Sequence, residues 1–234
     1  MVISTNQTVL SLLSGFSLAD RMERPYRYWF ATSCLPPESV DDLLGLPFVA
    51  ADLAGVSGKR DLHNNSRRYF DTEGRRAFPC METVSAAFQD SRVTSAIAQL
   101  FGAKLDRTYL RIEFAQDVDG FWLEPHTDIG VKMFTFLLYL SKDPSHGDLG
   151  TDVYDEDRTW VGRTPYRTNS GMIFVPSPIT YHGFEKRPIR GVRKLLVINY
   201  VTEEWRAREQ LAYPDRMIRA RDSVALGVPV TGAA

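Results

Sequence analysis

A histidine and an aspartate two residues apart, His126 and Asp128, are the pair in this sequence whose types and spacing best suit metal chemistry. They follow the segment Phe121-Trp122-Leu123 and precede an apolar run from Met133 to Leu140. Side chains at positions i and i+2 of an extended chain point to the same face, so both can reach one ion. Two imidazoles and one carboxylate form the set that binds non-haem Fe(II) by one face and leaves other positions open. The second imidazole must come from elsewhere in the chain.

A second histidine that can complete such a site is His182, which lies in the short segment Thr180-Tyr181-His182. This segment is typical of a strand, and closure of a β-barrel can bring it beside the strand that delivers His126. The set contains no thiolate, so it suits Fe(II), Mn(II) or Zn(II) rather than a soft ion. The open positions and the availability of iron favour Fe(II). The sequence therefore predicts an iron centre made by His126, Asp128 and His182.

Another His-x-Asp sequence, His146-Gly147-Asp148, competes with the first. It lies in a turn-rich stretch that also contains Pro144, whereas His126 lies between two strand-like segments. We therefore expect His146 to be a solvated loop residue. His63 also lies in a polar loop, and we expect it either to be exposed there or to contact a substrate.

The elements that must position these residues change in character along the chain. The first third predicts a strand, a helix start, an Arg-rich loop and two short helices, at 26–31, 36–44, 58–76 and 81–101. From Thr108 onward, short apolar or alternating runs separated by turn residues predict about eight strands. These are 109–114, 121–123, 132–141, 152–154, 159–161, 171–175, 180–182 and 194–202. A helix is expected at 203–210 and a loose tail at 224–234.

This order of elements predicts the fold class. It is mostly β with flanking α, a double-stranded β-helix (a cupin-like jelly roll) with N-terminal helices buttressing one sheet. No repeat, linker or low-complexity tract divides the 234 residues, so we expect a single domain over 1–234. Within it we expect the N-terminal strand and helices at 1–107, the jelly-roll core at 108–202, and the C-terminal helix and tail at 203–234.

Composition narrows the class of protein further. The net charge of −1 gives no general basic field, so neither nucleic acid nor a membrane surface is an expected partner. Cys34 and Cys80 are too few for a disulfide framework or a thiolate site, which indicates a reducing compartment. The N-terminus lacks the basic start of a signal peptide, and no apolar run is long enough for a membrane span. We expect a soluble, cytoplasmic protein that is a monomer or a homodimer and acts on a small-molecule substrate.

Six short motifs follow one another through the strand-rich part of the chain. They are His126-Thr127-Asp128, Thr135-Phe136-Leu137-Leu138-Tyr139-Leu140, Gly150-Thr151-Asp152-Val153-Tyr154, Asn169-Ser170-Gly171-Met172-Ile173-Phe174, His182-Gly183 and Arg193-Lys194-Leu195. In this order they resemble the Fe(II)/2-oxoglutarate-dependent dioxygenase superfamily, most closely its prolyl-hydroxylase-like branch. The resemblance covers roughly residues 108–202 and is specific, because it rests on the order of several elements rather than on one motif.

The resemblance implies roles for individual residues. The three predicted ligands match the positions that bind Fe(II) in the family. The co-substrate 2-oxoglutarate would chelate the iron, and its distal carboxylate would meet Arg193, eleven residues after His182. A planar guanidinium can grip a carboxylate through two hydrogen bonds. Arg190 is the rival for this role, and Gly191 suggests that Arg190 still lies in the preceding turn.

Two further residues match positions near the same carboxylate. Tyr139 stands where relatives often present a phenol to it, although a tyrosine in an apolar strand can equally be part of the core. Thr135 is a further candidate for the lining of the same pocket. Relatives often have a serine two residues after the strand arginine, and here that residue is Leu195. Details of carboxylate recognition should therefore differ from theirs.

The implied activity is oxidation of an unactivated C–H bond by O2, with conversion of 2-oxoglutarate to succinate and CO2. Halogenating relatives lack the carboxylate ligand, so Asp128 favours hydroxylation. Desaturation, epoxidation and ring closure stay open, because they depend on how the substrate is positioned.

The sequence defines the substrate less closely. The loop that contains His63, Arg67 and Arg68 is cationic and, with Arg163, can form an anion-binding rim; it can equally be a surface loop whose arginines pair with nearby acids. We expect a small polar or anionic metabolite, with a peptidyl or prolyl side chain of a protein as the alternative. A non-catalytic cupin-like metal-binding or sensory module is a third possibility. Arg193 disfavours it, because a simple metal site needs no distant cation.

Overall fold

The computed structural model describes residues 3–52, 58–59 and 67–219. Among these residues five α-helices precede the main run of strands: α1 (Thr5–Ser17), α2 (Pro37–Leu44), α3 (Thr72–Ala77), α4 (Pro79–Gln89) and α5 (Ser91–Phe101). Three strands lie between them: β1 (Asp20–Met22), β2 (Tyr28–Thr32) and β3 (Arg68–Tyr69). Eight strands follow: β4 (Tyr109–Asp117), β5 (Leu123–His126), β6 (Lys132–Tyr139), β7 (Asp152–Tyr154), β8 (Trp160–Arg163), β9 (Ser170–Phe174), β10 (His182–Phe184) and β11 (Arg193–Val201).

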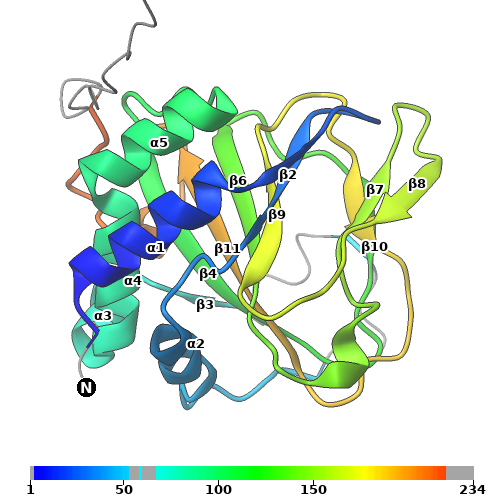
Figure 1. Cartoon of the computed structure of the whole chain (residues 1–234), viewed down its shortest axis with the longest axis horizontal. Helices are drawn as coiled ribbons and strands as arrows, with labels where there is room; N and C mark the ends of the chain where they lie inside the picture. Colours follow the sequence, from blue (N-terminus) through cyan, green and yellow to red (C-terminus); the bar gives the residue numbers. More distant parts are fainter. Residues whose placement is uncertain (1–2, 53–57, 60–66, 220–234) are drawn as a thin grey trace, which may run out of the picture.

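The strands form two antiparallel sheets (Figure 1). The seven strands of the major sheet have the order β1-β2-β9-β6-β11-β4-β3, and the four strands of the minor sheet have the order β5-β10-β7-β8. From β4 to β11 the chain passes back and forth between the two sheets, and the first of these strands pairs with the last along its whole length. This is the connectivity of a jelly roll. The predicted fold class is confirmed.

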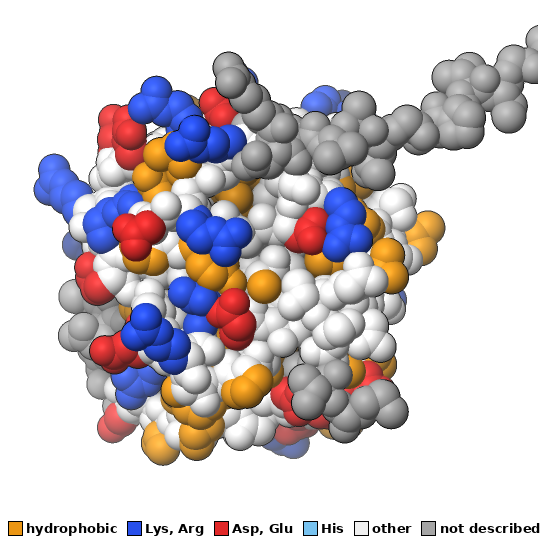
Figure 2. All heavy atoms as spheres, turned by 90° about the vertical axis from the view of Figure 1, so that its left-hand side faces the viewer, with side chains coloured by type: hydrophobic (Ala, Val, Ile, Leu, Met, Phe, Trp, Pro, Cys, Tyr) orange, Lys and Arg blue, Asp and Glu red, His pale blue; other side chains and the backbone are white. Residues whose placement is uncertain are grey.

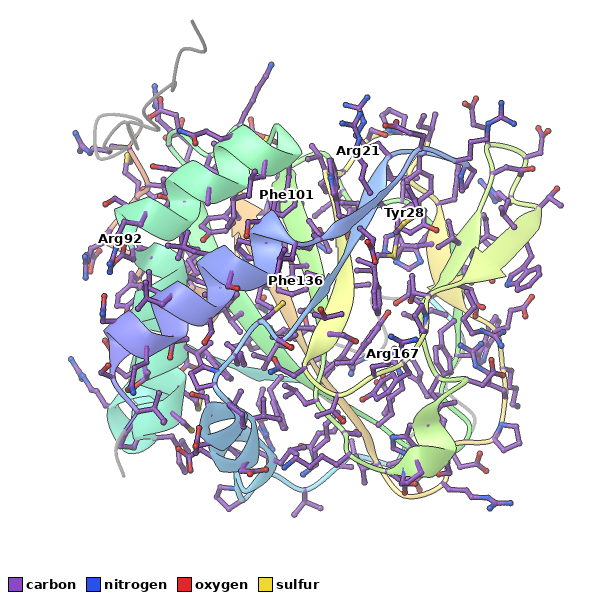
Figure 3. The ribbon with its side chains drawn as sticks, viewed as in Figure 1. Arg21, Tyr28, Arg92, Phe101, Phe136 and Arg167 are labelled. Carbon is purple, nitrogen blue, oxygen red and sulfur yellow. The ribbon has the colours of Figure 1, made fainter. Side chains whose placement is uncertain are left out.

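Helices α1, α4 and α5 cover the face of the major sheet that is turned away from the minor sheet (Figure 1). Phe16 of α1 contacts Phe101 of α5 and Phe136 of β6, with ring centroids 5.3 and 5.9 Å apart. Figure 3 labels Phe101 and Phe136 in this layer between the helices and the sheet. Because aromatic rings packed edge to face bury a large apolar area, this layer is the main hydrophobic core. The predicted buttressing of one sheet by N-terminal helices is confirmed.

Local sequence explains where these helices begin and end. The Ser4 hydroxyl and the Gln7 side chain form a capping box at the start of α1. The carboxylate of Asp90 accepts from the Arg92 amide at the start of α5, and Gly102 ends that helix with a φ of 74°. A residue with a Cβ is strained at that angle, so glycine is the natural stop.

Strand β4 shows how the major sheet separates two environments. Its residues alternate between Leu110, Ile112 and Phe114, which belong to the core under the helices, and the charged residues Arg111 and Glu113. Such alternation is usual for a strand with one face in water. Here all nine residues of β4 are buried. The charged face must therefore be covered by protein, and it lies on the side of the minor sheet.

Most of the predicted elements are present, with three differences. The sequence did not predict α1 or the short strand β1, and part of the predicted loop 58–76 forms β3 and α3, while residues 60–66 lie outside the described ranges. The helix expected at 203–210 is wrong, because only a short 3₁₀ turn, Arg208–Gln210, forms there. The Trp205 indole donates to the Ala207 carbonyl, and Leu211 bridges to Arg111 of β4. These tertiary contacts favour a turn over a continuous helix. The predicted tail, 224–234, lies outside the described residues.

The outer surface over the helices carries no concentration of one charge. On the face that Figure 2 shows, basic and acidic side chains alternate with apolar ones. Among the described residues, no helix combines the length and the apolar character that a membrane crossing needs.

Candidate metal centre and adjoining cavity

His126 and His182 come together across two neighbouring strands of the minor sheet. His126 ends β5, His182 begins β10, and the two residues are direct partners in the antiparallel register. Their ring centroids are 4.4 Å apart. Nδ1 of His126 lies 2.8 Å from the Glu124 carbonyl oxygen, and Nδ1 of His182 lies 3.0 Å from the Thr180 carbonyl oxygen. Because a carbonyl only accepts, each Nδ1 carries the proton and each Nε2 carries the lone pair that a metal needs.

Three features keep His182 ready for ligation. Gly183 allows β10 to approach β5 closely, since a Cβ there would lie 2.8 Å from the Leu123 carbonyl oxygen. Burial, together with the neighbouring imidazole of His126, lowers the pKa of His182 to about 3, so the ring is neutral near pH 7. The Phe174 ring packs against it, with centroids 4.7 Å apart. A neutral, oriented imidazole is the form that binds a metal ion.

Asp128 lies just beyond β5 and is held by two donors. Its Oδ1 is 2.5 Å from Nζ of Lys132, and its Oδ2 accepts from the Thr135 hydroxyl at 2.6 Å. Burial acts to raise the pKa of Asp128, but the charge of Lys132, the neighbouring His182 and these hydrogen bonds hold that pKa well below its usual range. Asn199 donates in turn to the Thr135 hydroxyl at 2.9 Å. Asp128 is therefore a fixed, ionised carboxylate.

The fit of this set to a metal ion rests on its chemistry. The two imidazoles and the carboxylate line one cavity. Within the described part of the chain no three His, Cys, Asp or Glu side chains stand close enough together to hold an ion. Binding by all three predicted ligands thus requires the Asp128 carboxylate to turn from the conformation in which Lys132 and Thr135 hold it. An ionised carboxylate accepts up to about four bonds, so it can ligate a metal while keeping a donor.

The cavity lies between the two sheets. The inner faces of β4, β6 and β11 form one wall, and residues of β5 and β10 form the other. Part of the lining is apolar and comes from Ala115, Leu137, Leu195 and Val197. The polar part includes the candidate metal ligands and Arg193. An interior that is apolar with a few convergent polar groups is typical of a small-molecule site.

Arg193 is at the place that the sequence predicts, at the start of β11 and in the cavity lining. Only 4% of it is exposed. Its Nε donates to the Leu149 carbonyl at 2.7 Å, and its Nη1 lies 2.5 Å from Oδ2 of Asp117. The guanidinium is therefore fixed in orientation and partly neutralised. Arg190, its rival, has an exposed side chain in the preceding loop and is not among the lining residues.

A second, outer pocket adjoins the first and shares with it His126, Asp128 and Lys132. Its other lining residues are Lys59, Arg111, Glu124, Thr127, Ile129, Trp205, Ala207 and Gln210. The guanidinium of Arg111 lies 4.7 Å from the Trp205 ring, and its Nε donates to Gln210 at 3.0 Å. No motif in the sequence predicts this pocket, because it joins residues about a hundred positions apart, such as Arg111 and Gln210.

Comparison with known proteins identifies the fold. No family model and no curated sequence matches the chain. A prolyl 4-hydroxylase from Phytophthora capsici superposes with a TM-score of 0.56 at 16% identity, over 86% of this chain and 66% of its own. A prolyl hydroxylase from Trichoplax adhaerens, in complex with a hypoxia-inducible-factor peptide, gives 0.56 at 15%, over 87% and 91%. HygX from Streptomyces hygroscopicus, with nickel and 2-oxoglutarate bound, gives 0.50 at 12%, over 76% and 82%.

This chain has the same fold as these two prolyl hydroxylases and HygX. In this fold the two sheets enclose the cavity described above. At these low identities the likeness extends to the architecture, so the roles of single residues depend on the contacts in this chain.

Thr135 and Tyr139, the other two residues predicted to contact the co-substrate, differ in their position relative to the cavity. Thr135 lines the cavity and holds Asp128. Tyr139 is fully buried and is not among the residues that line the cavity. Its hydroxyl is 2.7 Å from the hydroxyls of Thr151 and Thr164, and its ring stacks on Tyr166. Thr151 does line the cavity, so Tyr139 stands one residue behind the wall.

The weaker substrate candidates divide in the same way. Arg67 is buried and lines the inner cavity. Arg68, beside it in β3, is exposed and does not. Arg163 of β8 lines neither of the two pockets and pairs with Asp148 and Asp152, each at 2.7 Å. His63 lies outside the described residues.

His146 is a clear correction. It was expected in solvent, but only 1% of it is exposed. Asp143 caps the 3₁₀ turn Pro144–His146, which directs the ring inward to Tyr166, and Nε2 lies 2.7 Å from the Arg190 carbonyl oxygen. His146 is therefore a structural residue. It is not in the cavity lining, so the competing His-x-Asp sequence stands apart from the candidate centre.

Proposed function

We propose that this protein is an Fe(II)- and 2-oxoglutarate-dependent dioxygenase that hydroxylates an unactivated C–H bond and releases succinate and CO2. One observation carries the proposal: a histidine pair with both Nδ1 atoms committed to backbone carbonyls opens into the same buried cavity as Arg193. A metal-binding module without turnover has no need of a buried guanidinium beside its ligands. The oxygenase fold supports the same conclusion.

The residues divide the work as follows. His126, His182 and Asp128 would hold the iron, which supplies the activation of O2 when it is bound together with 2-oxoglutarate. Arg193 would bind the distal carboxylate of 2-oxoglutarate, a task that suits a guanidinium whose Nε is already fixed. Thr135 orients Asp128 through the hydrogen bond to Oδ2. The apolar half of the lining keeps bulk water away from the reacting atoms.

Asp128 favours one of two kinds of reaction. As a third protein ligand it would occupy the position that halogenating relatives leave to chloride. Its carboxylate is ionised and supported by Thr135, so it is available as a ligand. Hydroxylation is therefore the reaction that we propose.

For the substrate we propose a small polar or anionic metabolite that reaches the centre through the outer pocket. Lys59, Arg111 and Lys132 place three cationic side chains in its lining, against the carboxylates of Glu124 and Asp128. The alternative is a peptidyl residue, because two of the similar structures are prolyl hydroxylases and one of them holds a peptide. A screen for accelerated succinate release, with metabolites in one panel and proline-containing peptides in the other, separates the two.

The test of the activity itself is spectroscopic. Under anaerobic conditions, Fe(II) and 2-oxoglutarate bound together should give a weak charge-transfer band in the visible region. Adding O2 and the correct substrate should then bleach the band and release succinate. No band, together with no succinate from either panel, would exclude the dioxygenase.

A further inference from the structure

Asp117, at the inner end of β4, is shared by two buried arginines. Its Oδ1 lies 2.6 Å from Nη1 of Arg67, and its Oδ2 lies 2.5 Å from Nη1 of Arg193. All three residues are at most 5% exposed, and all three line the inner cavity. One carboxylate thus holds two guanidinium groups side by side at the wall where the co-substrate is proposed to bind.

The two arginines are also fixed by a pair of aromatic rings. The guanidinium carbon of Arg67 lies 5.3 Å from the centre of the Phe121 ring, and that of Arg193 lies 4.6 Å from the centre of the Phe184 ring. The two phenyl rings touch each other, with centroids 5.4 Å apart. Cation–π contacts of this kind restrict both groups without using a hydrogen-bond donor. The arrangement is therefore rigid, and it leaves donors available.

The charges of the described residues in this cluster do not cancel. Around Asp117 there are two guanidinium groups and one carboxylate. Glu113 adds a second carboxylate 3.4 Å from Nε of Arg67, but it also pairs with Arg111 at 2.9 Å. Within the part of the chain that the structure describes, these three cations and two anions leave one positive charge at the buried site. A buried charge is costly unless an opposite charge meets it.

Arg67 also keeps an unused donor. Its Nε is buried and makes no hydrogen bond in the described part of the chain, although it lies at ion-pair distance from Glu113. On the other side, Leu195, two residues after Arg193, lines the cavity with an apolar side chain and offers no donor to an anion. The wall near Arg193 thus lacks a polar partner from its own strand, and Arg67 stands across Asp117 from it.

We propose that Arg67 is a second binding residue for the distal carboxylate of 2-oxoglutarate, and that Asp117 is the positioning residue that keeps it beside Arg193. The incoming carboxylate would balance the extra positive charge of the cluster. This inference rests on the proposed function. It gives that function a two-arginine receptor whose halves come from the segment before β3 and from the start of β11.

The test compares two keto acids that differ only at the distal end. 2-Oxoglutarate and 2-oxopentanoate share the keto acid group that chelates the metal, but only the first has a second carboxylate. Anaerobic titration of the Fe(II)-loaded protein with each, followed by the charge-transfer band, gives a preference ratio. We expect Arg67→Ala to lower this ratio by about tenfold to a hundredfold, the loss of one charge-assisted hydrogen bond. Arg68→Ala, an exposed neighbour, should leave it unchanged.

A second variant separates recognition from folding. Arg67→Lys keeps the charge that Asp117 needs but loses the planar fork, so it should stay folded by thermal unfolding and still show a reduced ratio. If the parent protein gives a normal band and a folded Arg67→Ala or Arg67→Lys protein has an unchanged ratio, the role of Arg67 is overturned. The proposed function is not affected by that result. Absence of the band in the parent protein overturns the proposed function and this inference with it.

Discussion

The two faces of the major sheet are built from the same strands and differ in almost every other respect. Toward the helices, β4, β6 and β11 present large apolar side chains such as Phe136 and Ile198, which belong to one continuous core. Toward the minor sheet, the residues between them include Thr135, Asn199 and Arg193, all buried and all hydrogen-bonded. Because successive side chains of a strand point to opposite faces, one sequence pattern encodes both a core and a site.

The difference separates stability from chemistry. Apolar contacts on the helix side can supply most of the folding free energy, since burial of large apolar side chains is the dominant favourable contribution. The charged groups on the other side cost free energy to bury and hold one another through shared partners, as Asp117 holds Arg67 and Arg193. Substitutions on the helix side should therefore change mainly the free energy of unfolding. Substitutions on the side of the minor sheet should change mainly the affinity for the metal and for 2-oxoglutarate.

The largest expected effect is on the inner side. His126→Ala removes one of the paired imidazoles and should abolish the band given by Fe(II) with 2-oxoglutarate, together with turnover. His146→Ala is the matched control. His146 also has an aspartate two residues after it, Asp148, but it lies outside the cavity. It should keep the band, even if the loss of its buried contacts lowers the melting temperature. A band that survives in the first variant and vanishes in the second would reverse the assignment.

The next effect concerns the helix side. Phe136→Ala leaves a void among Phe16, Phe88 and their neighbours and should lower the free energy of unfolding by about 3–5 kcal/mol. Denaturant unfolding measures it. In the protein that remains folded, the 2-oxoglutarate titration should not change. Thr135 is the neighbour of Phe136 in β6 and lies on the opposite face of the sheet. Thr135→Val should weaken Fe(II) binding more than it lowers the free energy of unfolding, because Asp128 loses a hydrogen bond.

A smaller effect distinguishes two arginines within the inner region. Arg193→Ala should raise the 2-oxoglutarate concentration needed for half-maximal band intensity by about tenfold to a hundredfold, since a buried charge-assisted pair is lost. Arg190→Ala, with an exposed side chain, should change it little. Equal effects of the two substitutions would contradict the placement of the co-substrate against β11.

The smallest effect is expected at Arg163, a predicted rim residue that lines neither of the two pockets. Arg163→Ala removes one partner of Asp152, which keeps donors from Trp160, Arg187 and the Glu185 amide. The free energy of unfolding should fall by about 1 kcal/mol or less, and the 2-oxoglutarate titration should be unchanged. A marked loss of affinity for 2-oxoglutarate in this variant would show that Arg163 contributes to co-substrate binding.

Much of this arrangement can be read in the sequence, because it depends on local pattern. Alternation and turn residues predict the eight jelly-roll strands, and the strand context separates His126 from His146 as a candidate ligand. The burial of His146 cannot be read there, since the ring is buried only by Tyr166 and the Arg190 carbonyl, which are distant in the chain. For the same reason the alternation in β4 cannot show that its charged residues are buried as well as its apolar ones.

The arginine receptor shows the limit most clearly. Arg67 lies in a polar loop by sequence, and its partner Asp117 is 50 residues away. The helix expected at 203–210 fails similarly, because the contacts of Trp205 and Leu211 outweigh local propensity. Contacts between residues distant in the chain determine both the position of Arg67 and the absence of the helix. Such contacts cannot be predicted from the local pattern of a single sequence.

The most direct test is a crystal structure of the protein with Mn(II) and 2-oxoglutarate, in which anomalous scattering locates the metal. We expect the metal about 2.0–2.3 Å from Nε2 of His126 and of His182 and from the Asp128 carboxylate, turned from Lys132. We also expect the distal carboxylate of 2-oxoglutarate at Arg193, within reach of Arg67. A metal bound elsewhere, or 2-oxoglutarate outside the cavity between the sheets, would contradict the proposed centre.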